Sequence, residues 1–384
     1  MKKKTIITAL LLILTLGASA QLMEQREQSG IYSSSAESRQ KKTESQIKSE
    51  VSETVELMGI LSRTAGFEEF SDDLAGQYTE ETEAWFAQYK NHPTVAFYKD
   101  IRAQYGIGYE RVTNMAVHLG IEKGKVNLIG DRAELENNGW QNVDLDEFLK
   151  RINKFYADTR FHEFFEQHKP FYDEFLKTYD SYVMGYLHPE WFGRFYNGSE
   201  PTEQFRLIIG FTYGTTNNGA SRQLPNSPRE VFAVCGYNPN GQFSFDTSLP
   251  LHEFNHSFVN PLLDKAENAK TMQEVGTGLF QLSQSAMEQL HYNDWHIVIN
   301  ESLVRAAVIV YFYEHGYNKF AVNTLAVETL GKGFPWMLDV VTALRFYSAH
   351  RDQYPTLNDF YPEIARCLSK YIADRNGSFR LLSQ

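Results

Sequence analysis

The segment SLPLHEFNHSFVNP, from Ser248 to Pro261, contains an H-E-x-x-H pentapeptide in which His252 and His256 flank Glu253 and two further residues. Residues four positions apart lie one above the other on a helix, so the two histidines can converge on one metal ion. Glu253 is turned about 100° around the helix axis from His252, which lets it hold a reacting water without binding the metal itself. The segment therefore predicts either a zinc site or a surface helix with two solvated histidines.

Local signals favour a helix over this segment. Ser248 is expected to cap its start, Pro250 suits the first turn, and Pro261 is expected to end the helix. Phe254 and Phe258 can occupy the buried side. The two histidines and the glutamate then face away from at least part of the core.

A zinc site of this kind needs a third protein ligand. The extended metzincin pattern requires Gly and His where this chain has Val259 and Leu262, which excludes that class. Glu301 lies 45 residues after His256 and stands between the apolar stretches WHIVI and LVRAAVIVYF, at the expected start of a helix. A partly buried carboxylate needs a metal, a cation or several hydrogen-bond donors. We therefore prefer Glu301 as third ligand; the alternative is a surface salt bridge with Arg305.

Other side chains near the motif are rival third ligands. The acidic rivals lie in polar sequence, which is typical of a solvated surface, and His296 alternates with apolar residues, which favours a core or capping role. The rivals are Asp264, Glu267, Glu274, His291 and His296.

HEFNH, followed at a distance by NESLVR and preceded by predicted strands, resembles the gluzincin-type zinc metallopeptidases over roughly residues 205–311. The chain is also similar, from about residue 51 to 372, to a family of secreted bacterial proteins known as domain of unknown function 4932. The gluzincin resemblance implies a zincin-like fold, zinc bound by His252, His256 and Glu301, and Glu253 as general base. Thermolysin-like members place an acid one turn after the glutamate ligand, where it orients a histidine; this chain has Arg305 there.

The resemblance implies an exported zinc-dependent peptidase that acts on a peptide or protein substrate. A donor is needed for the oxyanion of the tetrahedral intermediate, and four downstream residues have suitable chemistry: Tyr347, His350, Arg345 and Arg305. We prefer Tyr347, because related zincins place a Tyr or His donor after the glutamate ligand. Two alternatives stay open: a non-catalytic zinc-containing binding or assembly protein of the cell envelope, and a helical envelope protein in which the motif is accidental.

The order of predicted elements indicates an α+β fold that is mostly helical, with a small sheet directly before the H-E-x-x-H helix. Residues 51–200 read as a helical N-terminal region, in which Pro170 is expected to begin or break a helix, and residues 201–384 as the catalytic region. Strands are expected over residues 205–213 and 229–237, with a possible third over 242–245. Residues 213–220 (YGTTNNGA) are either the border of a substrate cleft or an ordinary polar loop.

The N-terminal sequence predicts export. Residues 1–20 combine three lysines, an apolar run and Ala18-Ser19-Ala20, which is typical of a cleaved signal peptide. The apolar run is shorter than the roughly 20 residues of a membrane span, so we expect no span after cleavage and a periplasmic or secreted protein. Residues 21–50 read as a flexible polar tether.

Charge and cysteine content limit the partners and the means of stabilisation. The net charge of −11 argues against nucleic acid or an anionic membrane as a partner. Cys235 and Cys367 allow at most one disulfide, so stability is expected to come mainly from a hydrophobic core.

Overall fold

The computed structural model describes residues 47–382 apart from 238–245. The expected signal peptide, most of the expected tether and the possible strand over residues 242–245 lie outside the described residues. The tether ends earlier than expected, because Ile47 is buried and Ser49–Glu50 forms a short strand, β1, paired with the central sheet.

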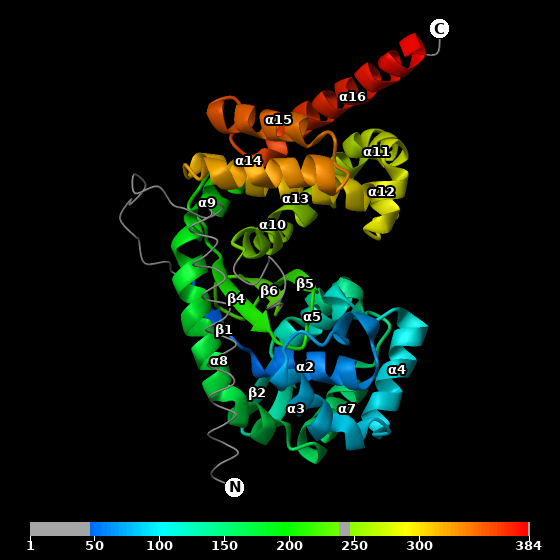
Figure 1. The fold of residues 1–384 in the computed structure, drawn as a ribbon, viewed down its shortest axis with the longest axis vertical. Helices are drawn as coiled ribbons and strands as arrows, with labels where there is room; N and C mark the ends of the chain where they lie inside the picture. Colours follow the sequence, from blue (N-terminus) through cyan, green and yellow to red (C-terminus); the bar gives the residue numbers. More distant parts are fainter. Residues whose placement is uncertain (1–46, 238–245, 383–384) are drawn as a thin grey trace.

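Two groups of helices lie on opposite sides of a small sheet (Figure 1). The first group, here called the N-terminal lobe, comprises α2 (Glu53–Thr64), η2 (Glu68–Phe70), α3 (Gln77–Phe86), η3 (Ala87–Tyr89), α4 (Pro93–Tyr105), α5 (Glu110–His118), the hairpin β2 (Leu119–Glu122) and β3 (Lys125–Leu128), α6 (Arg132–Leu135), η4 (Glu136–Trp140) and α7 (Leu145–Asp158). The long helix α8 (Phe161–Val183) then runs along one side of the molecule, followed by η5 (Met184–Tyr186), α9 (Glu190–Phe192) and η6 (Gly193–Asn197).

The second group, here called the C-terminal lobe, contains the remaining helices. It comprises α10 (Ser248–Leu263), α11 (Ala266–Leu282), α12 (Gln284–Gln289), α13 (Trp295–Glu314), α14 (Asn318–Ala326), η7 (Val327–Gly331), α15 (Met337–Ala349) and α16 (Leu357–Leu382). The predicted α+β class, mostly helical with a small sheet, is confirmed.

The central sheet has the strand order β1-β4-β6-β5, with β4 (Gln204–Gly210), β5 (Asn217–Arg222) and β6 (Glu230–Gly236). Strands β1, β4 and β6 are parallel, whereas β5 is an antiparallel strand at the edge. Both β4 and β6 are buried almost throughout, which explains their continuous apolar sequences. The two expected strands are therefore present, although β4 ends at Gly210 because the chain turns there.

The strand β5 was not predicted, because NNGASR lacks the apolar alternation of an ordinary strand. Its position depends on pairing with β6, from Asn217 opposite Cys235 to Arg222 opposite Glu230. Half of the segment that we considered as a cleft border or a loop, residues 217–220, is thus part of an edge strand.

Three local expectations about helix ends are wrong. Ser248 is the first residue of α10 rather than its cap, and its N–H is bound by the Asp246 side chain. The helix α10 continues through Pro261 to Leu263. Likewise α8 runs without interruption through Pro170. Burial of an apolar helix face can outweigh the backbone hydrogen bond that an internal proline removes.

The helix α13 forms the centre of the C-terminal lobe and contacts α10, α11, α14 and α15. It is long and apolar enough to cross a membrane by composition, but 78% of its apolar window is buried within the protein. Such burial is typical of the core helix of a soluble protein, so it is only weak evidence for a span.

A buried ion pair joins the edge strand to its neighbour. Arg222 on β5 donates from Nε to Glu230 Oε2 on β6 at 2.7 Å, and both side chains are less than 10% exposed. Arg222 also donates to the Val117 carbonyl on α5, and Glu230 accepts from Arg206 on β4 at 3.0 Å. This network connects β5 to the rest of the sheet and to the N-terminal lobe.

Replacing Glu230 with Ala should lower the free energy of unfolding by about 3–5 kcal/mol, because Arg222 keeps its charge in a buried position without a carboxylate partner. Urea denaturation measures this loss. The double variant Arg222→Met/Glu230→Leu should lose less, since it removes both charges. A loss below about 1 kcal/mol in Glu230→Ala would contradict the assigned role.

Candidate metal centre

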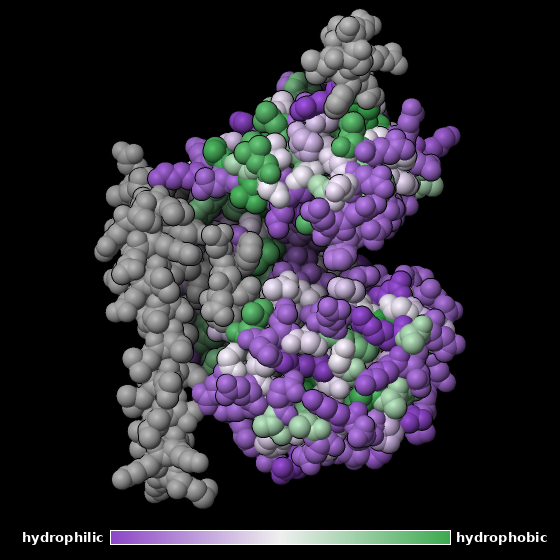
Figure 2. Space-filling view, turned by 45° about the vertical axis from the view of Figure 1, so that its right-hand side comes forward, coloured by the Kyte–Doolittle hydropathy of each residue, from purple (hydrophilic) through white to green (hydrophobic). Residues whose placement is uncertain are grey.

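A cleft of about 2330 Å³ lies between the two lobes. Figure 2 shows it as a hollow between two masses, with hydrophilic side chains along both rims. One wall consists of α10, α13, α14 and η7, and the facing wall of α5, α6 and η4. Residues 214–221, including the edge strand β5, line the cleft between these walls.

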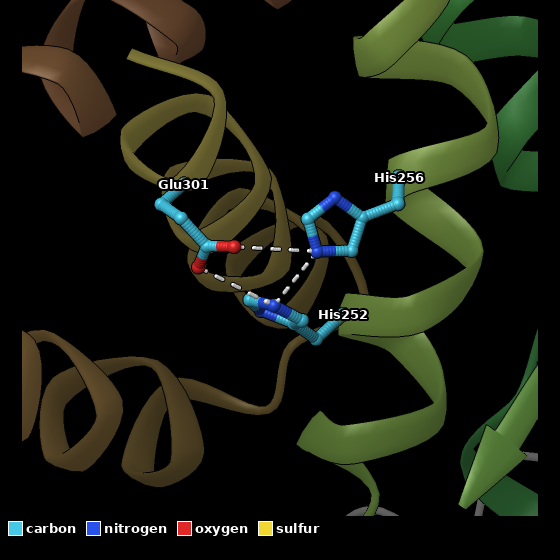
Figure 3. Close-up of side chains that lie close together, drawn as sticks. All are labelled: His252, His256 and Glu301. Atoms are coloured by element: carbon cyan, nitrogen blue, oxygen red, sulfur yellow. Dashed lines mark hydrogen bonds and ion pairs between the residues drawn. The ribbon is translucent and has the colours of Figure 1, made fainter. Parts of the chain in front are cut away.

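His252 and His256 of α10 meet Glu301 of α13 in this cleft (Figure 3). The two Nε2 atoms are 3.1 Å apart, His252 Nε2 lies 3.6 Å from Glu301 Oε2, and His256 Nε2 lies 3.5 Å from Glu301 Oε1. Ligand atoms around tetrahedral zinc, each about 2.0–2.1 Å from the ion, are about 3.3 Å apart. The three side chains therefore have the chemistry and the spacing of a three-ligand zinc site.

Within the described residues, this is the group of three His, Cys, Asp or Glu side chains whose ligand atoms lie close enough to hold an ion. The rival ligands are not part of this group, although Asp264, His291 and His296 line the same cleft. His296 pairs with Asp264 at 3.1 Å, and Glu267, Glu274 and His291 are exposed. Cys235 and Cys367 are free thiols and form no disulfide.

Glu301 lies in the second turn of α13 rather than at the start of the helix as expected. Asp294 begins the helix, because its side chain accepts from the backbone N–H groups of His296 and Ile297. The Glu301 side chain is 11% exposed, which agrees with the burial predicted from its apolar flanks.

The carboxylate of Glu301 has two further partners. Its Oε2 accepts from the Tyr292 hydroxyl at 3.0 Å and from Arg305 at 2.9 Å from Nη2 and 3.1 Å from Nε. The two interpretations that we set against each other, a metal ligand or a partner of Arg305, are therefore compatible. Burial acts to raise the pKa of Glu301, but the charge of Arg305 and the nearby histidines outweigh it and lower the pKa to about 2.

Arg305 itself is bound on its far side by Glu328 of η7, with Nη1 at 3.0 and 2.8 Å from the two carboxylate oxygens. Its Nη2 also donates to the Tyr292 hydroxyl at 2.9 Å. Neither Tyr292 nor Glu328 was singled out from the sequence. Tyr292 stands among polar residues, and Glu328 follows Glu301 by 27 positions without a motif.

Each histidine is set up for metal binding by its surroundings. His256 Nδ1 lies 3.1 Å from the Asn260 side-chain oxygen, one turn later on α10. An amide oxygen only accepts, so this bond requires the proton on Nδ1 and leaves the lone pair of Nε2 facing Glu301. Asn260 thus supplies the orienting partner that Arg305 cannot be. Burial lowers the pKa of His252 well below its ordinary value, which favours the neutral imidazole that binds metals.

Glu253 lines the same cleft and is 5% exposed. Burial raises its pKa to about 7, against the lowering effects of His256 and of a backbone hydrogen bond from Gly219. Gly219 belongs to β5 and lies directly against α10. A Cβ atom at this position would be 2.3 Å from the Glu253 carbonyl oxygen and 3.0 Å from His256 Cβ. The absence of a side chain at Gly219 therefore lets the edge strand approach the helix that carries both histidines.

Of the four candidates for stabilising an oxyanion, Arg305 lies at the cluster. The preferred candidate, Tyr347, is buried and donates to the Phe195 carbonyl at 2.6 Å, away from the cleft. The guanidinium of Arg345 lies over the Tyr313 ring, and His350 Nδ1 is bound to the carbonyl of its own helix. Tyr292, which lines the cleft beside Glu301, is a further hydroxyl at the cluster that the sequence did not reveal.

Comparison with known proteins gives a family for the chain. The family model "Domain of unknown function (DUF4932)" matches residues 46–367. Because the match covers most of the chain, the protein belongs to this family, as predicted. No curated protein and no solved structure matches the chain.

Replacing Gly219 with Ala should separate β5 from α10, because the new Cβ would overlap a backbone oxygen that cannot turn aside. We expect a loss of stability of about 1–3 kcal/mol and weaker zinc binding, measured by thermal unfolding and chelator competition. Gly331→Ala is the matched control, since a Cβ there meets no atom within 4 Å. Wild-type zinc affinity in Gly219→Ala would show that the close approach does not matter to the site.

Proposed function

We propose that this member of the DUF4932 family is a zinc-dependent peptidase with a gluzincin-like site. The observation that carries the proposal is the convergence of His252, His256 and Glu301 at separations close to those of tetrahedral zinc ligands. A zincin-like fold and export through the N-terminal signal are part of the same proposal. A bound zinc ion would supply a Lewis acid that polarises a carbonyl group and lowers the pKa of water.

Glu253 is the general base in this proposal. It follows His252 directly, is among the residues that line the same cleft, and has a buried carboxyl group that can exchange a proton near neutral pH. It would take a proton from the attacking water and transfer it to the leaving amine. Gly219 of the edge strand packs directly against the Glu253 backbone carbonyl, so Glu253 lies beside this strand.

The strand β5 supports a polypeptide as the substrate. One side of β5 pairs with β6, while β5 itself is the last strand of the sheet and lines the cleft. An extended peptide can add to such an edge through main-chain hydrogen bonds, independently of its sequence. The peptide would then pass in front of His256, because Gly219 lies against this residue.

Tyr292 is the donor that we assign to the oxyanion. Every N–H group of Arg305 that faces the site is directed at Glu301, Glu328 or Tyr292 itself. The single O–H of Tyr292 is directed at Glu301 in this structure, but it turns about one bond and can be redirected to a substrate oxygen beside that carboxylate.

The purified protein should contain about one zinc ion per chain, and both His256→Ala and Glu301→Ala should lose it, because each removes one of three ligands. Elemental analysis of wild type and variants measures the content. Glu274→Ala, an exposed acid away from the cleft, is the control and should keep the metal. The proposal is wrong if no transition metal copurifies and none can be loaded after chelation.

The variant Glu253→Gln should keep the zinc and lose roughly 1000-fold or more of peptide hydrolysis, since an amide cannot accept the proton of the attacking water. Cleavage of a mixed peptide library, followed by mass spectrometry, measures this loss. This experiment also separates a peptidase from a non-catalytic zinc protein, in which wild type and Glu253→Gln would both be inactive. Full turnover in Glu253→Gln would remove Glu253 as the base.

A further inference from the structure

Arg305 is a buried cation between two carboxylates, one of which is a proposed metal ligand. The side chains of Arg305, Glu301 and Glu328 are 13%, 11% and 10% exposed. The rings of Phe334 and Tyr292 lie 5.1 and 6.0 Å from the guanidinium carbon and close the space around it. The three charged groups thus form a continuous buried chain from α13 to η7.

The contacts of Glu301 are unequally divided between its two oxygens. Tyr292 and Arg305 both donate to Oε2. Oε1 faces His256 Nε2 at 3.5 Å and accepts from neither of these donors, while His252 Nε2 lies 3.6 Å from Oε2. Two donors on one oxygen reduce its ability to bind a cation, whereas the other oxygen keeps its lone pairs for a ligand bond.

The charges of Glu301, Arg305 and Glu328 matter as much as their geometry. A single cation beside a metal site repels a divalent ion, and the repulsion is strong where water is excluded. Both oxygens of Glu328 accept from Nη1 of Arg305, whereas Nε and Nη2 of Arg305 contact Glu301. Arg305 is therefore neutralised by Glu328, and the charge of Glu301 remains available to the metal.

We infer that Arg305 and Glu328 are positioning residues for the metal centre: Glu328 holds and neutralises Arg305, and Arg305 fixes Glu301 so that it offers Oε1 to the metal. This inference rests on the proposed zinc site and assigns Glu301 an orienting cation, Arg305, which Glu328 holds in turn from η7. η7 is a π-helical turn, a distortion that proteins often retain at functional sites. A buried ion pair contributes little to stability compared with apolar residues of similar size, so stability alone does not account for the pair.

The double variant Arg305→Met/Glu328→Leu tests the inference, because it removes both buried charges together. We expect cooperative unfolding to persist and zinc affinity, measured by competition with a chromogenic chelator, to fall roughly 10- to 100-fold. The visible absorption of the cobalt-substituted protein should also change, since Glu301 would be free to alter its coordination. The control Arg63→Met/Glu83→Leu removes an ion pair of the N-terminal lobe outside the cleft, whose arginine is 7% exposed, and should keep the zinc affinity and the cobalt spectrum of the wild type.

A second variant, Glu328→Gln, keeps the shape of the side chain and removes its charge. It should lower zinc affinity about tenfold and should fold even if the double variant does not. Wild-type zinc affinity and cobalt spectrum in either folded variant would overturn the inference. A wild-type protein that binds zinc but cleaves no peptide would refute the proposed peptidase activity and leave this inference intact, because the readout is metal binding.

Discussion

The structure of the C-terminal lobe depends on the burial of one glutamate carboxylate in a mostly apolar helix. This burial is unfavourable unless the charge has partners. Glu301 lies within α13, in which 14 of the 20 residues are buried and most of these are apolar. An ionised carboxylate is tolerated there only because donors and cations surround it. Arg305 and Tyr292 supply these from α13 and the loop before it, and His252 and His256 face it from α10. The burial of Glu301 is thus balanced by Arg305 and Tyr292, and the packing of α10 on α13 brings both histidines to the same carboxylate.

The sheet meets a second requirement, which is to bring a main-chain edge close to the histidines. Gly219 allows contact between β5 and α10 that any larger residue would prevent. The ion pair between Arg222 and Glu230 then holds β5 against β6 at its other end. A polar strand with little propensity of its own is therefore fixed by one glycine contact and one buried charge pair.

The sequence predicted those parts of the molecule that depend on local periodicity. The spacing of His252 and His256 and the apolar flanks of Glu301 were enough to predict that side chains from two helices lie together, as Figure 3 shows. The strands β4 and β6 were also predicted, because parallel buried strands have continuous apolar sequences. What could not be predicted depends on contacts distant in sequence. Glu328, Tyr292 and β5 owe their roles to partners on other elements, and the preference for Tyr347 failed because its hydroxyl is bound to Phe195 instead.

The two walls of the cleft come from different parts of the chain, and this division has a consequence for how the family can diversify. His252, His256, Glu301 and their orienting partners all belong to the C-terminal lobe, whereas α5, α6 and η4 supply the facing wall. Substitutions on the facing wall can therefore accumulate without disturbing the cluster of His252, His256 and Glu301. One half of the molecule is constrained by the geometry of this cluster, while the other can change the shape and charge of the space opposite it.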